Sequence, residues 1–253
     1  MTRVLHLSDT HLHAPGASTL YPQIDTRARL VEVLDRVRAY GPFDAVVVTG
    51  DVCDDGSEVG ARAVRELVQG LAPVVLAVPG NHDLAEPVRA VFGEPVAEVG
   101  EWLFVGIETQ VEGEVAGVGD DVAPALVGIG DRPAVLLMHH PLESRSTHEW
   151  FTLAGREAAV AAVERHTAPL VVLSGHTHEA YAARCGTAHL FGAPATYYSI
   201  RHDGGDFEPV LAQYGASVLT LHGVTSRPSV EVVMLVDDAM RVDDHIALSS
   251  EGD

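Results

Sequence analysis

The chain has few cysteines and no apolar segment long enough to cross a membrane as a helix. Its two cysteines, Cys53 and Cys185, lie in unlike contexts, so we expect free thiols rather than a disulfide. Every apolar run falls well short of the roughly 20 residues that a transmembrane helix needs. The few residues before the first run leave no room for a signal peptide, so we expect a cytoplasmic protein.

Basic residues are also scarce. The chain has no lysine, and its 16 arginines face 36 acidic residues, which gives a formal net charge of −20. A surface of this sign repels polyanions, which argues against nucleic acid or an anionic membrane as the main partner. The 14 histidines, by contrast, are numerous enough to supply metal ligands.

Length and composition suit one α/β domain. The 253 residues are 47% hydrophobic and 21% charged, and no internal repeat or low-complexity block is visible. We predict a single domain over residues 1–236, whose part from about residue 187 is rich in strands. The acidic segment 237–253 is predicted to be a flexible tail.

Short apolar runs alternate with segments of helical periodicity through most of the chain. Valine and leucine dominate the runs, as expected of strands buried on both faces, and they cover residues 3–7, 43–48, 74–78, 102–107, 134–138 and 170–173. Helices are predicted over 26–40, 57–71 and 155–166. The alternation predicts layers of sheet and helix. Near the C-terminus, segments 217–221 and 230–235 are predicted to pair as a hairpin.

Five of these runs end in clusters of potential metal ligands. The clusters are residues 8–11, 50–54, 80–83, 139–141 and 175–178. Taken singly, each has a structural explanation as a turn, a helix cap, a strand end or a loop. Their joint occurrence, always after a strand, favours a metal site, because ligands bind at the carboxyl ends of strands in open α/β sheets.

The order of the clusters is Asp-x-His, Gly-Asp, Gly-Asn-His-Asp, His and Gly-His-x-His. This order resembles the signature of the calcineurin-like metallophosphoesterase superfamily and spans residues 9–178. The chain length and segment 24–30 look most like the class III cyclic-nucleotide phosphodiesterase branch. The resemblance implies an α/β fold with a layered β-sandwich flanked by helices. It also implies a dinuclear metal site at the carboxyl ends of the strands.

Seven metal ligands follow from the resemblance. It assigns Asp9, His11 and His178 to the first ion, Asn81, His139 and His176 to the second, and Asp51 to both. Asp9 and His11 are two residues apart, so in an extended backbone both side chains point the same way, and the same holds for the last histidine pair. Only a carboxylate offers two oxygens to ions roughly 3.5–4 Å apart. Nitrogen and oxygen ligands favour two ions of manganese or iron, with zinc or cobalt as alternatives.

Two such ions would also overcome the repulsion of the acidic surface. Their four positive charges, less those of two aspartates and a bridging hydroxide, leave one positive charge for an anionic diester. The resemblance implies that His82 stabilises the transferring phosphoryl group or protonates the leaving oxygen, and that Asp54 orients His82.

Other polar residues in the clusters are expected to have structural roles. His139 rather than its neighbour His140 is the predicted ligand. Asp83 is predicted to anchor its own loop. Cys53 is predicted to be a small buried residue, with metal ligation as the alternative.

Substrate selection is expected from loops around the strand ends. The loop 194–206 contains Tyr197 and Tyr198, which are candidates for stacking on a base. An aromatic anchor of a surface loop is the alternative for both tyrosines. Asn81 and His82 are the other candidates for substrate contact.

The predicted function is hydrolysis of phosphodiester bonds in small substrates, 3',5'-cyclic nucleotides among them, by attack of a metal-bridging hydroxide. A phosphomonoesterase or a nucleotide pyrophosphatase of the same superfamily is the alternative. A non-catalytic scaffold that keeps the fold is a third interpretation. The expected partner is a small phosphate ester, and the resemblance is compatible with a homodimer.

Overall fold

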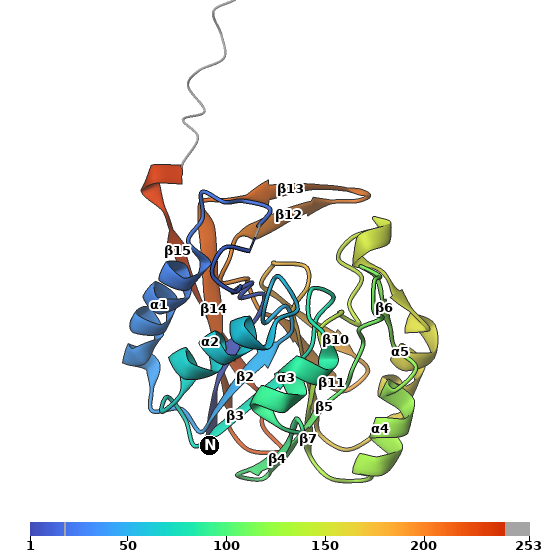
Figure 1. The fold of residues 1–253 in the computed structure, drawn as a ribbon. Coiled ribbons are helices and arrows are strands. Elements are labelled where there is room, and N and C mark those ends of the chain that lie inside the picture. The colour runs from blue at the N-terminus through green and yellow to red at the C-terminus, as the bar shows by residue number, and fades with distance from the viewer. Residues whose placement is uncertain (18, 241–253) are drawn as a thin grey trace, which may run out of the picture.

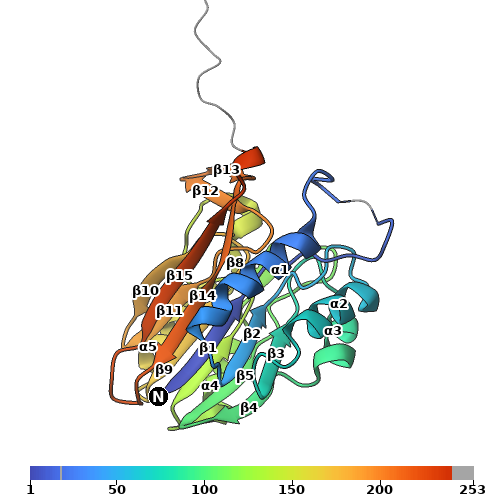
Figure 2. The same ribbon diagram turned by 90° about the vertical axis from the view of Figure 1, so that its left-hand side faces the viewer.

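Two mixed β-sheets pack face to face, and helices cover both outer faces. This is a computed structural model that describes residues 1–17 and 19–240. Helices α1, α2 and α3 lie on one side of the sandwich, and α4 and α5 lie on the other (Figures 1 and 2). The predicted layered sandwich with flanking helices is therefore confirmed. No helix in the described ranges is long and apolar enough to cross a membrane.

The first sheet has five strands and the second has six. In spatial order the first contains β15 (Ser229–Val236), β14 (Gln213–Leu221), β1 (Thr2–Leu7), β2 (Ala45–Thr49) and β3 (Val74–Val78). The second contains β10 (Tyr181–Cys185), β11 (Ala188–Gly192), β9 (Leu170–Ser174), β7 (Ala134–Leu137), β5 (Trp102–Gly106) and β4 (Val96–Val99). Two small sheets pair β12 (Ser199–Asp203) with β13 (Asp206–Val210), and β6 (Gly117–Val118) with β8 (Leu153–Ala154).

The described residues contain five α-helices, three of which lie close to where the periodicity predicts them. The five are α1 (Thr26–Val37), α2 (Glu58–Val68), α3 (Ala85–Phe92), α4 (Val122–Ile129) and α5 (Arg156–Arg165), with short 3-10 turns η1 (Arg38–Tyr40), η2 (Glu149–Phe151) and η3 (Asp238–Met240). α1 begins after Asp25, whose carboxylate accepts a hydrogen bond from the Ala28 N–H at 2.9 Å. α2 begins after Ser57, whose hydroxyl accepts from the Gly60 N–H at 3.0 Å.

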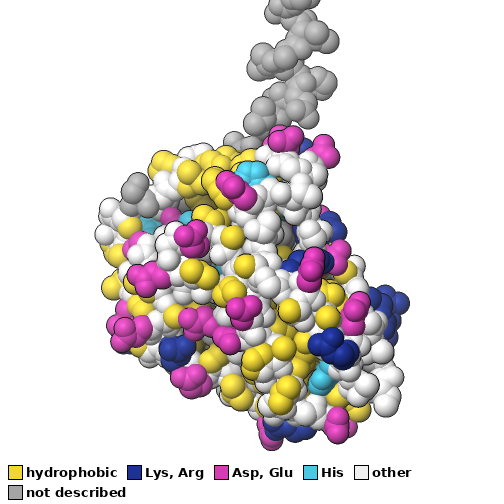
Figure 3. Space-filling model, turned by 90° about the vertical axis from the view of Figure 1, so that its right-hand side faces the viewer, with side chains coloured by type: hydrophobic (Ala, Val, Ile, Leu, Met, Phe, Trp, Pro, Cys, Tyr) yellow, Lys and Arg dark blue, Asp and Glu magenta, His cyan; other side chains and the backbone are white. Residues whose placement is uncertain are grey.

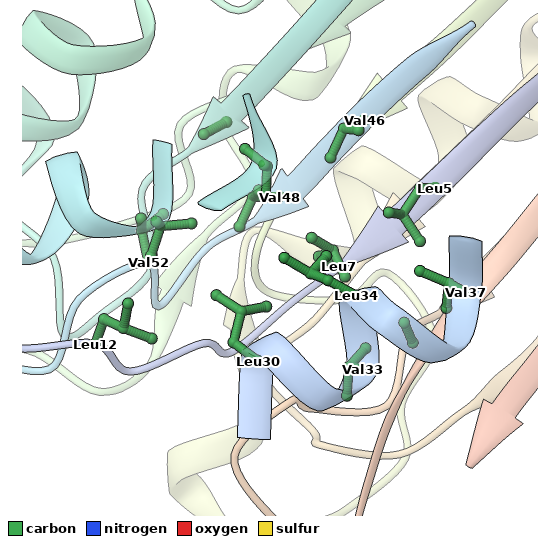
Figure 4. Close-up of a cluster of buried hydrophobic side chains, with 14 of the residues drawn as sticks. Leu5, Leu7, Leu12, Leu30, Val33, Leu34, Val37, Val46, Val48 and Val52 are labelled. Atoms are coloured by element: carbon green, nitrogen blue, oxygen red, sulfur yellow. The ribbon is translucent and has the colours of Figure 1, made fainter. Parts of the chain in front are cut away.

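The hydrophobic core has three layers: one between the sheets, and one under the helices on each side. Figure 4 shows the layer beneath α1, where Leu30 and Leu34 point toward Leu5 and Leu7 of β1. Leu5, Leu7 and Leu30 are fully buried. Each such side chain stabilises the fold by roughly 1.5–3 kcal/mol relative to an exposed one. The apolar stripe of α1 thus fixes the first sheet against its helices.

Two helices were not predicted from the sequence. In α4 the buried residues are Val122, Leu126 and Ile129, but Val127 on the opposite side is 83% exposed. When apolar residues lie on all sides of a helix, the sequence shows no 3.6-residue alternation of apolar and polar positions. α3 is short and carries Pro87 in its first turn. Packing against the rest of the protein, rather than a local sequence pattern, therefore determines that both segments are helical.

The C-terminal hairpin lies where the sequence predicts it. β14 and β15 pair as the predicted hairpin, with Leu219 opposite Val230. Asp237, where the acidic tail was predicted to begin, accepts a hydrogen bond at 3.2 Å from Arg29, and the short turn η3 follows. The rest of the predicted tail, 241–253, lies outside the described residues.

Candidate metal centre

The five polar clusters meet at one end of the sandwich, where strands of both sheets end. β1, β2 and β3 of the first sheet lead into 8–11, 50–54 and 80–83, and β7 and β9 of the second lead into 139–141 and 175–178. We expected these loops to meet at the rim of one open sheet. The rim is instead shared between two sheets that face each other.

One group of candidate ligands contains two carboxylates and two imidazoles. In Asp9, His11, Asp51 and His178 one potential ligand atom of each residue lies within 4.8 Å of the others. The Nε2 of His178 lies 3.4 Å from an oxygen of Asp9, and the Nε2 of His11 lies 3.5 Å from Oδ2 of Asp51. All four residues are buried.

A second group lies on the other side of Asp51. The Nε2 of His139 lies 3.4 Å from Oδ1 of Asp51 and 3.1 Å from Oδ1 of Asn81. The rings of His139 and His176 contact each other with centroids 4.9 Å apart. Asp51 therefore turns one oxygen toward each group, which is the arrangement that a bridging carboxylate requires.

The protein holds each of four imidazoles by a hydrogen bond at one ring nitrogen. The Nδ1 atoms donate to oxygen: that of His11 to Asp54 at 2.8 Å, that of His139 to the Thr49 carbonyl at 2.8 Å, and that of His178 to the Tyr198 carbonyl at 2.7 Å. His176 instead donates its Nε2–H to the Trp150 carbonyl at 2.8 Å. The second nitrogen of each ring is then the one that could bind a metal, as in metal-binding histidines.

The second nitrogens of His11, His139 and His178 lie beside carboxylate or amide oxygens, which accept hydrogen bonds and do not donate them. The Nε2 of His11 is buried without a hydrogen-bond partner in the described residues. Its neighbours in the group are carboxylate oxygens, which are also acceptors. Buried acceptors that face one another are costly unless a cation lies between them. The residues present therefore fit bound metal ions.

His140 is buried beside this group, but both of its nitrogens have protein partners. Its Nδ1 lies 2.8 Å from the Thr109 hydroxyl, and its Nε2 lies 3.0 Å from the Val115 carbonyl. Burial, together with the neighbouring histidines, holds its pKa well below the usual range. A neutral ring with both nitrogens engaged has no lone pair for a metal, so the geometry favours His139 over His140.

The backbone at the site is left-handed rather than extended. Five non-glycine residues of the described chain have positive φ, and all five are candidate ligands: Asp9 at 52°, His11 at 47°, Asp51 at 46°, His176 at 68° and His178 at 50°. The expectation that each Asp or His pair converges through an extended backbone is therefore wrong. Such residues cost roughly 1–3 kcal/mol each and persist where surrounding structure holds them.

Two glycines make room for the ligands. A β carbon on Gly50, whose φ is +89°, would overlap the imidazole of His139. A β carbon on Gly80 would overlap Asp51. Only glycine allows the backbone to approach these side chains so closely.

Asp54 contacts both the buried His11 and the exposed His82. The same carboxylate oxygen that accepts from His11 lies 3.1 Å from Nδ1 of His82. Burial opposes the charged form of His82, but the charges of Asp51 and Asp54 outweigh it and raise the pKa to about 9. The His82 side chain is 44% exposed and so is accessible from solvent. The sequence predicted the Asp54–His82 pair and missed the contact with His11.

Asp83 and Cys53 have structural contacts. The Asp83 carboxylate accepts hydrogen bonds from the backbone N–H groups of Val52, Cys53 and Gly80 at 2.8–2.9 Å. Burial and the charge of Asp51 raise the Asp83 pKa to about 6. The Cys53 thiol lies 3.2 Å from the same carboxylate and is fully buried, and burial raises its pKa. Asp83 thus anchors its loop, as predicted, and Cys53 fills space.

The two tyrosines proposed for substrate stacking face inward. Tyr197 is 2% exposed and Tyr198 is 8% exposed. Their rings pack on His11 and His178 with centroids 5.0 and 4.7 Å apart. The hydroxyl of Tyr197 also accepts from the Tyr21 N–H at 3.1 Å. In this conformation both rings support ligand histidines.

Comparison with known proteins agrees with this geometry. The family profile of calcineurin-like phosphoesterases matches residues 2–180. The chain belongs to this family. It is therefore a metal-dependent phosphoesterase of a family that uses a dinuclear metal centre, and its clusters of histidine and aspartate could hold metal ions.

Several relatives are cyclic nucleotide phosphodiesterases, consistent with the class III branch. The chain is 30% identical to the 3',5'-cyclic adenosine monophosphate phosphodiesterase CpdA of Pseudomonas aeruginosa, over 87% of this chain and 85% of the relative. It is 31% identical to a cAMP/cGMP dual specificity phosphodiesterase of Mycobacterium tuberculosis, over 78% of this chain and 68% of that one. Among solved structures, a dimetal phosphatase from Danio rerio superposes with a TM-score of 0.66 at 12% identity, covering 93% of this chain and 98% of that one. That structural likeness shows the fold alone.

Proposed function

We propose that this phosphoesterase cleaves phosphodiester bonds in small substrates and that 3',5'-cyclic nucleotides are among them. The observation that carries the proposal is the position of Asp51, with one oxygen toward His11 and the other toward His139. The names of the relatives in Pseudomonas and Mycobacterium support the choice of a cyclic diester.

Most of the site residues would bind one of two metal ions, and one would act as a general acid. We infer that Asp9, His11 and His178 hold one ion, that Asn81, His139 and His176 hold the other, and that Asp51 joins them. Manganese or iron suits these ligands, with zinc or cobalt as alternatives. When bound, the ions would acidify a bridging water into the attacking hydroxide and stabilise charge on the phosphoryl oxygens.

His82 is positioned to act on the leaving group. It is the exposed histidine of the site, and Asp54 fixes its ring through Nδ1 and favours the protonated form. The opposite nitrogen, Nε2, is then free to hydrogen-bond a phosphoryl or leaving oxygen. Asn81 has its side-chain oxygen at the second ion site and is the other candidate for substrate contact.

The surface favours small substrates. Figure 3 shows acidic side chains spread over one face of the molecule with fewer arginines among them. With a net charge of −20, a long polyanion would be repelled along its whole length, whereas a small diester meets only the local charge of the ions. We therefore propose a small-molecule substrate without nucleic acid or membrane as a partner, in the cytoplasm, with a homodimer as the assembly to test.

The test compares bis(p-nitrophenyl) phosphate with the monoester p-nitrophenyl phosphate, with manganese added and after chelation. We expect metal-dependent diester cleavage that Asn81→Ala abolishes, followed by cleavage of 3',5'-cyclic AMP. A strong preference for the monoester would replace this proposal with a phosphatase. No turnover of either ester by protein shown to contain two metals would indicate a narrow natural substrate or the non-catalytic scaffold.

A further inference from the structure

Trp150 stands apart from the other aromatic residues of the protein. It is 47% exposed. Every other phenylalanine, tyrosine and tryptophan among the described residues is buried or half-buried. The adjacent Phe151 is 8% exposed. Tryptophan is enriched where proteins contact ligands and partners, which makes this exposed indole a candidate contact.

The backbone of Trp150 belongs to the metal centre. Its carbonyl accepts the Nε2–H of His176 at 2.8 Å. The ring of Phe151, one residue further on, packs on the His176 ring with centroids 5.3 Å apart. The backbone that carries the indole is therefore in direct contact with a proposed metal ligand.

The indole is held in place from two directions. Its ring lies 5.2 Å from that of His148 and 5.7 Å from that of Phe207, measured between centroids. Phe207 also packs on Phe151 at 5.3 Å. These contacts form a continuous row of rings from the indole back to His176, so little conformational entropy remains to be lost when a ligand binds.

The hairpin that carries Phe207 is itself tied to this segment. The Gly204 carbonyl at its tip accepts hydrogen bonds from the Thr147 N–H at 2.9 Å and the Ser146 hydroxyl at 3.1 Å. His202 of β12 donates to the Thr177 carbonyl at 2.9 Å, beside the last histidine pair of the site. The hairpin thus contacts both the segment that carries the indole and the loop that carries the last histidine pair.

We propose that Trp150 is the specificity-determining residue on which the nucleobase of a substrate stacks while its phosphate lies at the metal centre. This rests on the proposed function and deepens it by naming the residue that contacts the base of a nucleotide substrate. A flat aromatic face accepts any base, and stacking on it is worth roughly 1–3 kcal/mol per base. The indole thus supplies base affinity without hydrogen-bond selection between bases.

Measured ligand affinities test the stacking proposal without requiring turnover. Manganese-loaded protein is titrated by calorimetry with adenosine 5'-monophosphate and with ribose 5-phosphate, which has the same phosphate and lacks the base. We expect the nucleotide to bind about 5- to 160-fold more tightly, the range given by roughly 1–3 kcal/mol of stacking. Trp150→Ala should remove that difference and leave ribose 5-phosphate unaffected, because the substitution keeps the main-chain carbonyl on His176.

Two further measurements make the outcome specific. The chain has two tryptophans, and Trp102 is 3% exposed, so quenching of the emission by nucleotide reports on Trp150. Trp150→Phe keeps an aromatic face and should retain most of the preference. Val127→Ala, at an 83% exposed apolar position on α4, is the matched control and should change nothing.

Each result decides the matter. Equal affinity for the two ligands in the unaltered protein, or a preference that survives Trp150→Ala, would overturn the stacking proposal. Loss of affinity for both ligands in the variant would assign Trp150 to the metal centre instead. A change of oligomeric state in Trp150→Ala without a change in binding would make the indole a protein contact. The phosphodiesterase proposal fails separately, if no diester is cleaved.

Discussion

Replacing Asp54 by asparagine should weaken turnover and metal binding together. One oxygen of Asp54 receives hydrogen bonds from His11 at 2.8 Å and lies 3.1 Å from His82, and its side chain is 11% exposed. Asparagine keeps the shape and an acceptor oxygen but removes the charge. We therefore expect each contact to weaken without the loop unfolding.

The magnitude follows from the difference between charged and neutral hydrogen bonds. A bond to a charged group contributes roughly 1.5–3 kcal/mol, against roughly 0.5–1.5 for a neutral pair. Losing about 1–1.5 kcal/mol at each histidine corresponds to about a 5- to 13-fold change. Through His82 this appears in kcat at saturating manganese. Through His11 it appears in the manganese dissociation constant measured by calorimetry.

A double variant separates the effect on kcat from the effect on manganese binding. In a His82→Gln background, Asp54→Asn should still weaken manganese binding but should lower kcat no further. Asp55→Asn is the matched control, since that neighbouring carboxylate accepts from the backbone N–H groups of Ala14 and Ser57 and touches neither histidine. Unchanged manganese affinity in Asp54→Asn would refute the link to His11, and an unchanged kcat would refute the link to His82.

Three other perturbations test the site and its surroundings. His82→Ala should lower kcat by at least tenfold and keep both metals by elemental analysis, and metal loss would contradict its role as a non-ligand. Gly50→Ala should abolish binding of the ion at His139 while the circular dichroism spectrum stays folded, and normal metal content would show that the close approach is dispensable. His6 is 1% exposed, and burial lowers its pKa to about 3, so it stays neutral in the folded protein while the unfolded chain takes up a proton below pH 6.5. The free energy of unfolding of metal-free protein should therefore fall as pH drops from 6.5 toward 3, by up to about 1.4 kcal/mol per pH unit from this group, and a His6→Gln variant with the same slope would contradict this.

Much of the fold is encoded in patterns that are local in sequence. The stripe that includes Leu30 and Leu34 predicts α1, and valine-rich runs such as β2 predict buried strands. The clusters that follow the strands identify the site, because metal ligands must be particular residue types. These parts depend on spacing and chemistry that the sequence displays directly.

Other parts depend on tertiary structure and leave no such pattern. The left-handed backbone at Asp9 and His178 is imposed by the loops around it, and neither residue type requires it. The carbonyls of Thr49, Trp150 and Tyr198 orient three histidines, and a main-chain oxygen has no sequence signature. Pairing of two sheets at a common rim is likewise decided by the core between them.

The shared rim gives the metals a mechanical role. Asp9, His11, Asp51 and Asn81 follow strands of the first sheet, whereas His139, His176 and His178 follow strands of the second. Each proposed ion therefore fastens one sheet to the other at the end of the sandwich. With metals bound, neither sheet can separate without breaking coordination bonds in both sites. Amide hydrogen exchange in β2 and β9 should then slow in parallel, so that the two halves open as one cooperative unit.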